Sequence, residues 1–196
     1  MPPAEGYITT ADGVRLLFQR LGDGPKTVII PNGIYLLHDF QRLADGRTLI
    51  FYDLRNRGLS DGVSDRSMLA RGIHHDVDDL EAVRRHFGIN QVDVIGHSYI
   101  GLMVILYAMK YPDNVNRVVQ IGPMQPNAGK RYPVHLTCAD ATLAEVSAQL
   151  GELQKQRESE DPVAFCKKFW AILRVIYVAN RADAGKIDWG RCDLPN

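Results

Sequence analysis

Neither sign of charge is in excess in this 196-residue sequence, because 23 Lys and Arg residues balance 23 Asp and Glu residues. Nucleic acids and anionic membrane surfaces select proteins with a basic excess, so the balance argues against both as main partners. Long apolar runs are also missing: the longest, from Tyr99 to Met109, is well short of the roughly 20 residues that cross a bilayer. The first residues have neither the cationic nor the apolar region of a signal peptide. We therefore expect no nucleic-acid partner and no membrane partner.

Cysteine is scarce as well. Cys138, Cys166 and Cys192 are odd in number and widely spaced, a pattern that predicts neither a disulfide framework nor a zinc site. Such cysteines suit a reducing compartment, so we expect a cytoplasmic protein. The segment 74–79 holds His and Asp residues four apart, but carboxylates gather near helix N-termini because the helix dipole favours them. We expect no metal and no cofactor.

The order of elements predicts an α/β fold. Six short segments that are rich in apolar or β-branched residues and bounded by turn residues are typical of strands, and they are residues 6–10, 14–21, 27–30, 48–52, 92–95 and 117–121. Three further segments are predicted helices, namely residues 38–44, 73–87 and 99–111. Because strands and helices alternate from residue 27 to residue 121, we expect βαβ units and a mainly parallel sheet with flanking helices.

The last third of the sequence has a different pattern. Residues 133–196 contain no convincing pair of strands, and residues 142–158 and 162–180 are predicted helices. Apolar residues on one side of the second helix indicate a packing face; they are Phe165, Phe169 and Leu173. We therefore expect a core of residues 1–132 and a helical cap of residues 133–196. Ligands of open parallel sheets bind at the carboxyl end of the strands, where we place this cap.

The most informative stretch is Gly96-His97-Ser98-Tyr99-Ile100-Gly101, where a strand is followed by an apolar helix. A serine on such a sharp turn is exposed at the edge of the sheet, at the positive end of the next helix. Small residues such as Gly96 and Gly101 are needed there because the strand and helix backbones pass close together. Two interpretations are open for Ser98, a nucleophile or a helix N-cap, for which serine is favoured.

Three stretches together resemble the α/β-hydrolase superfamily, in particular its proline iminopeptidase-like and esterase-like branch. The first is the turn around Ser98, which resembles the family's Gly-His-Ser-Tyr/Trp-Gly-Gly elbow. The segment Tyr52–Asp61 resembles the family's Asp-x-Arg-Gly-x-Gly-x-Ser turn, and Pro31–Ile34, with Gly33 inside it, stands where the family has its oxyanion loop. The resemblance extends from about Gly6 to Gly122 and more weakly through the cap.

The resemblance implies a serine hydrolase. Ser98 would attack a small ester or a short peptide, form an acyl-enzyme and release it to water. The oxyanion would be stabilised by the backbone N–H groups of Tyr99 and Ile34.

The sequence departs from the family pattern at three positions. Ile100 replaces a glycine, and we expect its β-branched side chain to crowd the elbow. Asn32 replaces the histidine of the oxyanion loop, and Asn56 replaces a glycine of the turn after the fourth strand. The last change is mild because asparagine tolerates a left-handed backbone.

The acid and the base of a catalytic triad have no matching positions in this sequence. Family members place them after a seventh and an eighth strand, which follow the cap. His97 is expected to point away from the serine, while His74, His75 and His86 are expected on the polar side of one helix. We therefore expect a hydrolase truncated after the cap, which a missing C-terminal segment or a second chain completes.

Two other interpretations remain open. The first is a non-catalytic ligand-binding protein that keeps a vestigial serine. The second is an esterase that uses His135, at the start of the cap, as its base. The cap also carries an acidic stretch that would either bind a substrate's free amine or form a solvated helix face, and its residues are Glu152, Glu158, Glu160 and Asp161.

Overall fold

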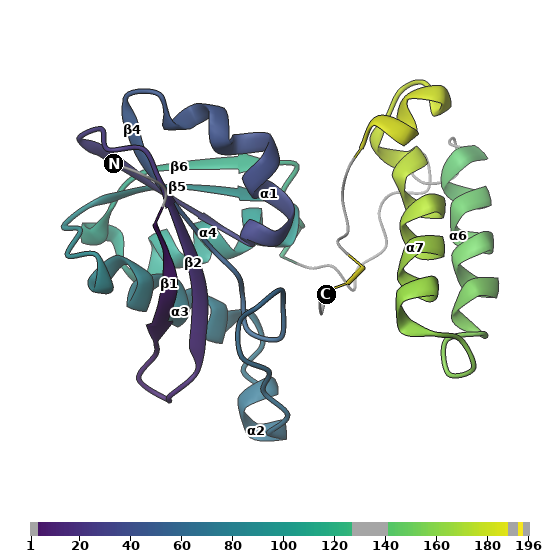
Figure 1. The fold of residues 1–196 in the computed structure, drawn as a ribbon, viewed down its shortest axis with the longest axis horizontal. Coiled ribbons are helices and arrows are strands. Elements are labelled where there is room, and N and C mark those ends of the chain that lie inside the picture. Colours follow the sequence, from purple (N-terminus) through teal and green to yellow (C-terminus); the bar gives the residue numbers. More distant parts are fainter. Residues whose placement is uncertain (1–3, 127–140, 188–191, 194–196) are drawn as a thin grey trace. The chain divides into compact units, whose positions relative to one another are not determined.

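The structure is a computed structural model that describes residues 4–126, 141–187 and 192–193 (Figure 1). The described residues form two compact units, one reaching to Pro126 and the other beginning at residue 141. The domain boundary expected at residue 132, and with it His135, lies outside the described residues.

The first unit contains a six-stranded sheet with the strand order β1-β2-β4-β3-β5-β6. Its strands are β1 (Ala4–Thr9), β2 (Arg15–Leu21), β3 (Lys26–Pro31), β4 (Arg47–Tyr52), β5 (Val92–His97) and β6 (Val115–Ile121). Strands β3 to β6 pair in parallel, and β2 pairs antiparallel with both β1 and β4. The mainly parallel sheet predicted from the sequence is confirmed.

Helices connect these strands. They are α1 (Gly33–Phe40), α2 (Arg66–Leu69), α3 (Ile73–His86) and α4 (Tyr99–Lys110), with the 3-10 turns η1 (Gln41–Ala44) and η2 (Pro112–Asn114). The sequence misplaces one of them: the helix predicted to begin at His38 begins at Gly33, directly after β3. Helix α2 was not predicted, and the side chain of Asp65 caps its N-terminus.

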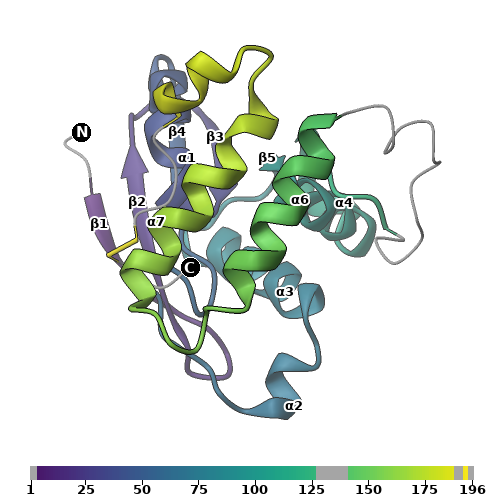
Figure 2. The ribbon, with the colours of Figure 1, turned by 90° about the vertical axis from the view of Figure 1, so that its right-hand side faces the viewer.

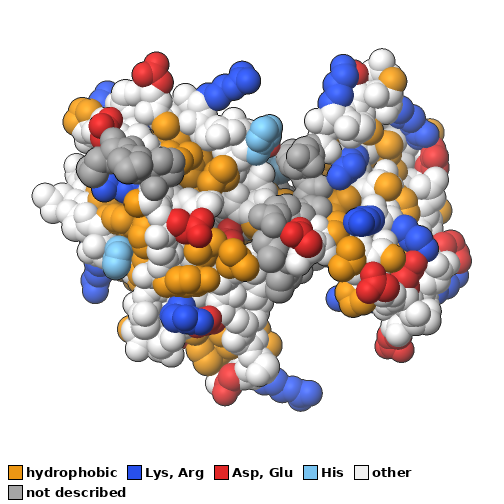
Figure 3. Space-filling model, in the orientation of Figure 1, with side chains coloured by type: hydrophobic (Ala, Val, Ile, Leu, Met, Phe, Trp, Pro, Cys, Tyr) orange, Lys and Arg blue, Asp and Glu red, His pale blue; other side chains and the backbone are white. Residues whose placement is uncertain are grey.

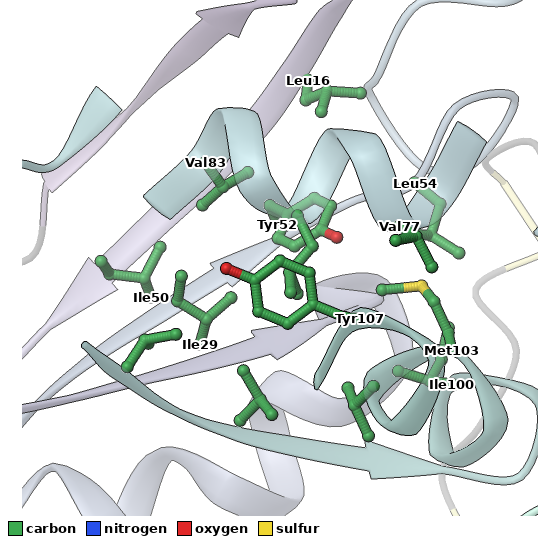
Figure 4. Packing of buried hydrophobic residues seen from close by; sticks show 14 of the residues in the cluster. Leu16, Ile29, Ile50, Tyr52, Leu54, Val77, Val83, Ile100, Met103 and Tyr107 are labelled. Atoms are coloured by element: carbon green, nitrogen blue, oxygen red, sulfur yellow. The ribbon is translucent and has the colours of Figure 1, made fainter. Parts of the chain in front are cut away.

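The helices cover both faces of the sheet. On one face α3 and α4 pack on Ile29 and Ile50, in the larger of two buried clusters, which Figure 4 shows. On the other face α1 contributes Leu36 to a smaller cluster with Val28 and Ile30. Neighbouring residues of β3 thus point into opposite clusters, as expected for a strand that is buried on both sides.

A partly buried ion cluster ties three segments of this unit together. The guanidinium of Arg55 binds Asp79 of α3 through Nε at 2.6 Å and Asp12 of the β1–β2 turn through Nη1 at 2.6 Å. His75 lies beside them, with Nε2 at 3.8 Å from Oδ2 of Asp12. The prediction that His75 lies on the polar side of its helix is therefore wrong, since only 7% of this residue is exposed.

The second unit is helical. It contains α6 (Ala141–Gln154) and α7 (Pro162–Leu173), which lie side by side in Figures 1 and 2, and the 3-10 turns η3 (Arg174–Tyr177) and η4 (Arg181–Lys186). The two predicted helices are confirmed, although both end earlier than expected, at Gln154 and at Leu173. Val146 and Leu153 of α6 are buried, whereas the predicted packing face of α7 is only half-buried.

The cysteines correct another expectation. Cys166 of α7 forms a disulfide with Cys192, at a sequence separation of 26 residues. The spacing rule failed because two cysteines outside any recognisable motif meet through tertiary folding. Disulfides are typical of oxidising compartments, so the cysteines do not support a cytoplasmic location.

Candidate active site

The loops that carry the three motifs meet at the carboxyl edge of the sheet. In the parallel register Pro31 at the end of β3 pairs with Tyr52 at the end of β4. Strand β3 also pairs with β5, and His97 at the end of β5 pairs with Ile121 of β6. The chain therefore turns out of the sheet at neighbouring points after each of these strands. This edge is the place where α/β sheets bind ligands.

Ser98 occupies the sharp turn between β5 and α4. Its backbone has φ 54° and ψ −120°, a conformation that is strained for any residue with a side chain. Three backbone hydrogen bonds hold it there: Ser98 N–H donates to the Ile121 carbonyl at 3.0 Å, and the Ser98 carbonyl accepts from Leu102 and Met124. Such strain persists only where the surroundings enforce it, and strained residues cluster at functional sites.

The side chain of Ser98 is not used as a helix cap. The residue stands at the N-cap position of α4, but it forms no side-chain capping hydrogen bond. The N-cap interpretation left open by the sequence therefore has no support in the geometry.

The glycines of the elbow are sterically required. A Cβ atom on Gly96 would lie 2.3 Å from the carbonyl oxygen of Ile100, and one on Gly101 would lie 2.9 Å from Cβ of Pro123. Ile100 itself is accommodated, since its side chain is 3% exposed and lies beside Met103 in the core (Figure 4). The expected crowding of the elbow is absent because the side chain points into the core instead.

Tyr99 follows the nucleophile candidate and begins α4. The first N–H groups of a helix have no intrahelical acceptor, so the N–H of Tyr99 is a donor at the elbow. Its phenolic hydroxyl donates to Oδ2 of Asp76 at 2.5 Å. Burial raises the pKa of Asp76, and burial together with this hydrogen bond raises the pKa of Tyr99.

The loop after β3 is short, and the side chain of Asp53 from the next loop holds it. Asn32 adopts a left-handed backbone with φ 69°, and Gly33 starts α1 immediately behind it. The N–H of Ile34 donates to Oδ1 of Asp53 at 2.7 Å. In the sequence, Asp53 stands out only as part of the segment Tyr52–Asp61. Its position as the first residue after β4, next to the loop after β3, is the signal that could have identified it.

Asn56, the third departure from the family pattern, is also left-handed, with φ 59°. Its side-chain oxygen accepts the N–H of Val63 at 2.5 Å. Asn56 thus adopts the left-handed backbone that asparagine tolerates.

No histidine among the described residues forms a hydrogen bond with Ser98. His97 is half-buried, and burial lowers its pKa. His38, His74 and His86 are exposed on helices. The structure thus brings Ser98 and the loop of Ile34 to one edge but supplies no base from residues 4–126, 141–187 and 192–193.

Three of the four residues in the acidic stretch of the cap form local contacts. Glu152 pairs with Lys155 at 2.6 Å, Glu160 pairs with Lys168, and Asp161 accepts the N–H of Ala164 at the start of α7. Within the described residues no group of three His, Cys, Asp or Glu side chains could hold a metal ion. On the face seen in Figure 3, acidic and basic side chains are interspersed rather than gathered by sign.

The family model and two of the most similar known proteins all belong to the hydrolases. Residues 26–159 match the family model described as alpha/beta hydrolase fold. A proline iminopeptidase of Saccharolobus solfataricus is 35% identical over 101 residues, which are 48% of this chain and 32% of that protein. The bifunctional esterase/perhydrolase DCH of Acinetobacter calcoaceticus is 31% identical over 129 residues, or 62% of this chain and 45% of that protein.

Solved structures also indicate the alpha/beta hydrolase fold. The crystal structure of an alpha/beta hydrolase from Novosphingobium aromaticivorans superposes with a TM-score of 0.51 at 30% identity, covering 60% of this chain and 43% of that one. The chain therefore spans less than half the length of these relatives. None of the helices in the described part of the chain is long and apolar enough to span a bilayer.

Proposed function

Since this chain belongs to the alpha/beta hydrolase fold family, we propose that it is the nucleophile-bearing part of a serine hydrolase that cleaves a small ester or amide. Ser98 attacks the substrate carbonyl, and the N–H groups of Tyr99 and Ile34 stabilise the oxyanion. Water then releases the acyl group. The observation that carries the proposal is the strained backbone of Ser98, combined with a side chain that caps no helix.

The substrate class we propose is an ester of a small acid, rather than a peptide with a free amino terminus. Recognition of a free amine needs a carboxylate that is not already neutralised. In the acidic stretch, Glu152 and Glu160 are paired with lysines and Asp161 caps a helix, so three of its four carboxylates are engaged and only the exposed Glu158 remains as a candidate for an amine. This arrangement favours an esterase over an iminopeptidase. Nucleic acids and membranes are not proposed as partners, because the sequence has no net charge.

We further propose that the acid and the base are contributed by polypeptide other than the described residues, either a C-terminal segment or a second chain. This proposal is supported by Ser98, whose hydroxyl forms no hydrogen bond with a histidine in the described part of the structure. The same observation favours one rival function, a ligand-binding protein in which Ser98 no longer reacts.

A fluorophosphonate probe separates these possibilities. The intact mass of the purified protein is measured before and after treatment, together with the hydrolysis of 4-nitrophenyl butyrate and of proline 4-nitroanilide. We expect one adduct, located on Ser98, and faster turnover of the ester. The variant Ser98→Ala should take up no probe, whereas Ser147→Ala, which changes an exposed serine of α6, should react like the wild type. If the wild-type protein, assayed together with the polypeptide that completes its triad, is as unreactive as Ser98→Ala, the result favours the binding protein instead.

A further inference from the structure

Asp53 is a buried carboxylate that directly follows β4, at the carboxyl edge of the sheet. Only 5% of the residue is exposed. Its Oδ1 accepts the N–H of Ile34 at 2.7 Å and its Oδ2 accepts the N–H of Leu59 at 3.3 Å. The carboxylate therefore joins two loops, one following β3 and one following β4.

Gly58 makes room for this carboxylate. A Cβ atom on Gly58, which has φ 55°, would lie 2.0 Å from Oδ2 of Asp53. Because a methyl group at Gly58 would displace the carboxylate, the backbone of the loop after β4 is fitted to the side chain of Asp53.

The backbone of Asp53 is fixed independently of its side chain. Its N–H donates to the carbonyl of Leu17 at 3.0 Å, and its carbonyl accepts the hydroxyl of Ser60 at 2.7 Å. The side chain thus projects from a rigid support toward the start of α1. Helix α1 needs such a partner because Asn32, at its N-cap position, forms no side-chain capping bond. A carboxylate accepts helix N-terminal N–H groups well, since the helix dipole favours negative charge there.

We propose that Asp53 is a positioning residue for the oxyanion hole, holding the turn Asn32–Ile34 beside the elbow of Ser98. The parallel pairing of β3 with β4 and β5 places this turn between the two loops that carry Asp53 and Ser98. In the resting protein the N–H of Ile34 is satisfied by Asp53. When an oxyanion forms on the substrate, this N–H is shared between the two oxygens as a three-centre hydrogen bond. The proposal rests on the proposed function of Ser98.

The test uses three variants. Asp53→Ala removes the acceptor, and Asp53→Asn keeps an oxygen for Ile34 while placing an amide group against the N–H of Leu59. The matched control is Asp61→Asn, which lies in the same loop and pairs with Arg15 rather than with the turn. If Asp53→Ala does not fold, Asp53→Asn, which has nearly the same volume, carries the test.

The first measurement is the exchange rate of the Ile34 amide hydrogen, followed by NMR on ¹⁵N-labelled protein. We expect exchange at least about tenfold faster in Asp53→Ala than in the wild type, with Asp61→Asn unchanged. An unaltered exchange rate of Ile34 in Asp53→Ala would overturn the positioning role. This measurement needs no catalysis, so it remains decisive even if Ser98 proves unreactive and the proposed function fails.

The second measurement separates a catalytic effect from a merely structural one. For ester hydrolysis by the folded protein we expect kcat to fall about 100-fold in Asp53→Ala, with KM within about threefold, because the Ile34 N–H is no longer held in place for the transition state. Asp53→Asn should recover part of this loss. A lower melting temperature with unchanged kcat would assign Asp53 a structural role only and contradict the proposal.

Discussion

Asp76 of α3 accepts the phenolic hydrogen of Tyr99 at 2.5 Å, and so fixes the residue that directly follows Ser98. The Ile34 side of the site has a comparable anchor in Asp53. Each of the two proposed oxyanion donors therefore belongs to a residue that is held by a carboxylate from a different element. Charge-assisted hydrogen bonds of this kind are stronger than neutral ones and give a rigid geometry.

The Tyr99–Asp76 contact predicts a loss of stability in Tyr99→Phe. The substitution leaves the ring in place but removes the donor from a largely buried carboxylate, at a cost of about 2 kcal/mol. Urea unfolding of Tyr99→Phe, Asp76→Asn and the double variant measures the coupling between the two residues. Tyr7→Phe, which changes an exposed tyrosine of β1, is the control and should stay within about 0.5 kcal/mol of the wild type. Additive effects in the double variant would show that the hydrogen bond contributes nothing.

Substitution of Ile100 tests whether its side chain stabilises the core or strains the turn at Ser98. If its side chain belongs to the core, as the structure shows, Ile100→Ala creates a cavity and lowers the free energy of unfolding by about 3 kcal/mol. If the side chain instead strained the turn, the same substitution would stabilise the protein. Met109→Ala in the same helix is the control, since that side chain is exposed. Thermal unfolding of the three proteins decides between the two outcomes.

Glu81 predicts how stability depends on pH. Burial by itself raises the pKa of this carboxyl, but hydrogen bonds from Arg84, Tyr107 and Arg85 outweigh burial and lower the pKa to about 2, from an ordinary 4.5. A carboxyl with a lower pKa in the folded state stabilises the fold above its unfolded pKa, and this contribution is lost as the pH falls toward the folded value. Glu81→Gln should therefore be less stable than the wild type at pH 7, by about 2 kcal/mol.

The same argument gives the pH profile of the difference. Between about pH 5 and about pH 2 the wild type should lose its advantage over Glu81→Gln, because Glu81 becomes protonated. Denaturant unfolding at several pH values measures this convergence. Glu152→Gln, at an exposed position of α6, serves as the control and should differ from the wild type by less than about 1 kcal/mol at pH 7. A constant difference for Glu81→Gln would contradict the prediction.

Much of the first unit could be predicted because the relevant signals are local. Runs of β-branched residues mark β3 and β4, and an apolar residue every third or fourth position marks α3. The turn at Ser98 is equally local, since the glycines that it needs lie within three residues of it. These features fix the order of strands and helices and place the nucleophile candidate.

What the sequence did not reveal depends on contacts between distant segments. Helix α1 begins at Gly33 because Asp53, about 20 residues later, receives the N–H of Ile34. His75 is buried because Arg55 brings Asp12 against the start of α3. The Cys166–Cys192 bond likewise joins residues that no spacing rule connects. Periodicity shows which residues share a face but not which partner covers that face.

The position of β3 in the sheet affects how the protein is made. This strand lies between β4 and β5, yet β5 begins about 60 residues after β3 ends. At roughly 5–20 residues per second, a ribosome needs about 3–12 seconds to synthesise that interval. Throughout it, one hydrogen-bonding edge of an apolar strand has no partner, and such edges pair readily with other chains. Slower translation at low temperature lengthens this exposure, so the edge of β3 that pairs with β5 is an aggregation risk during synthesis.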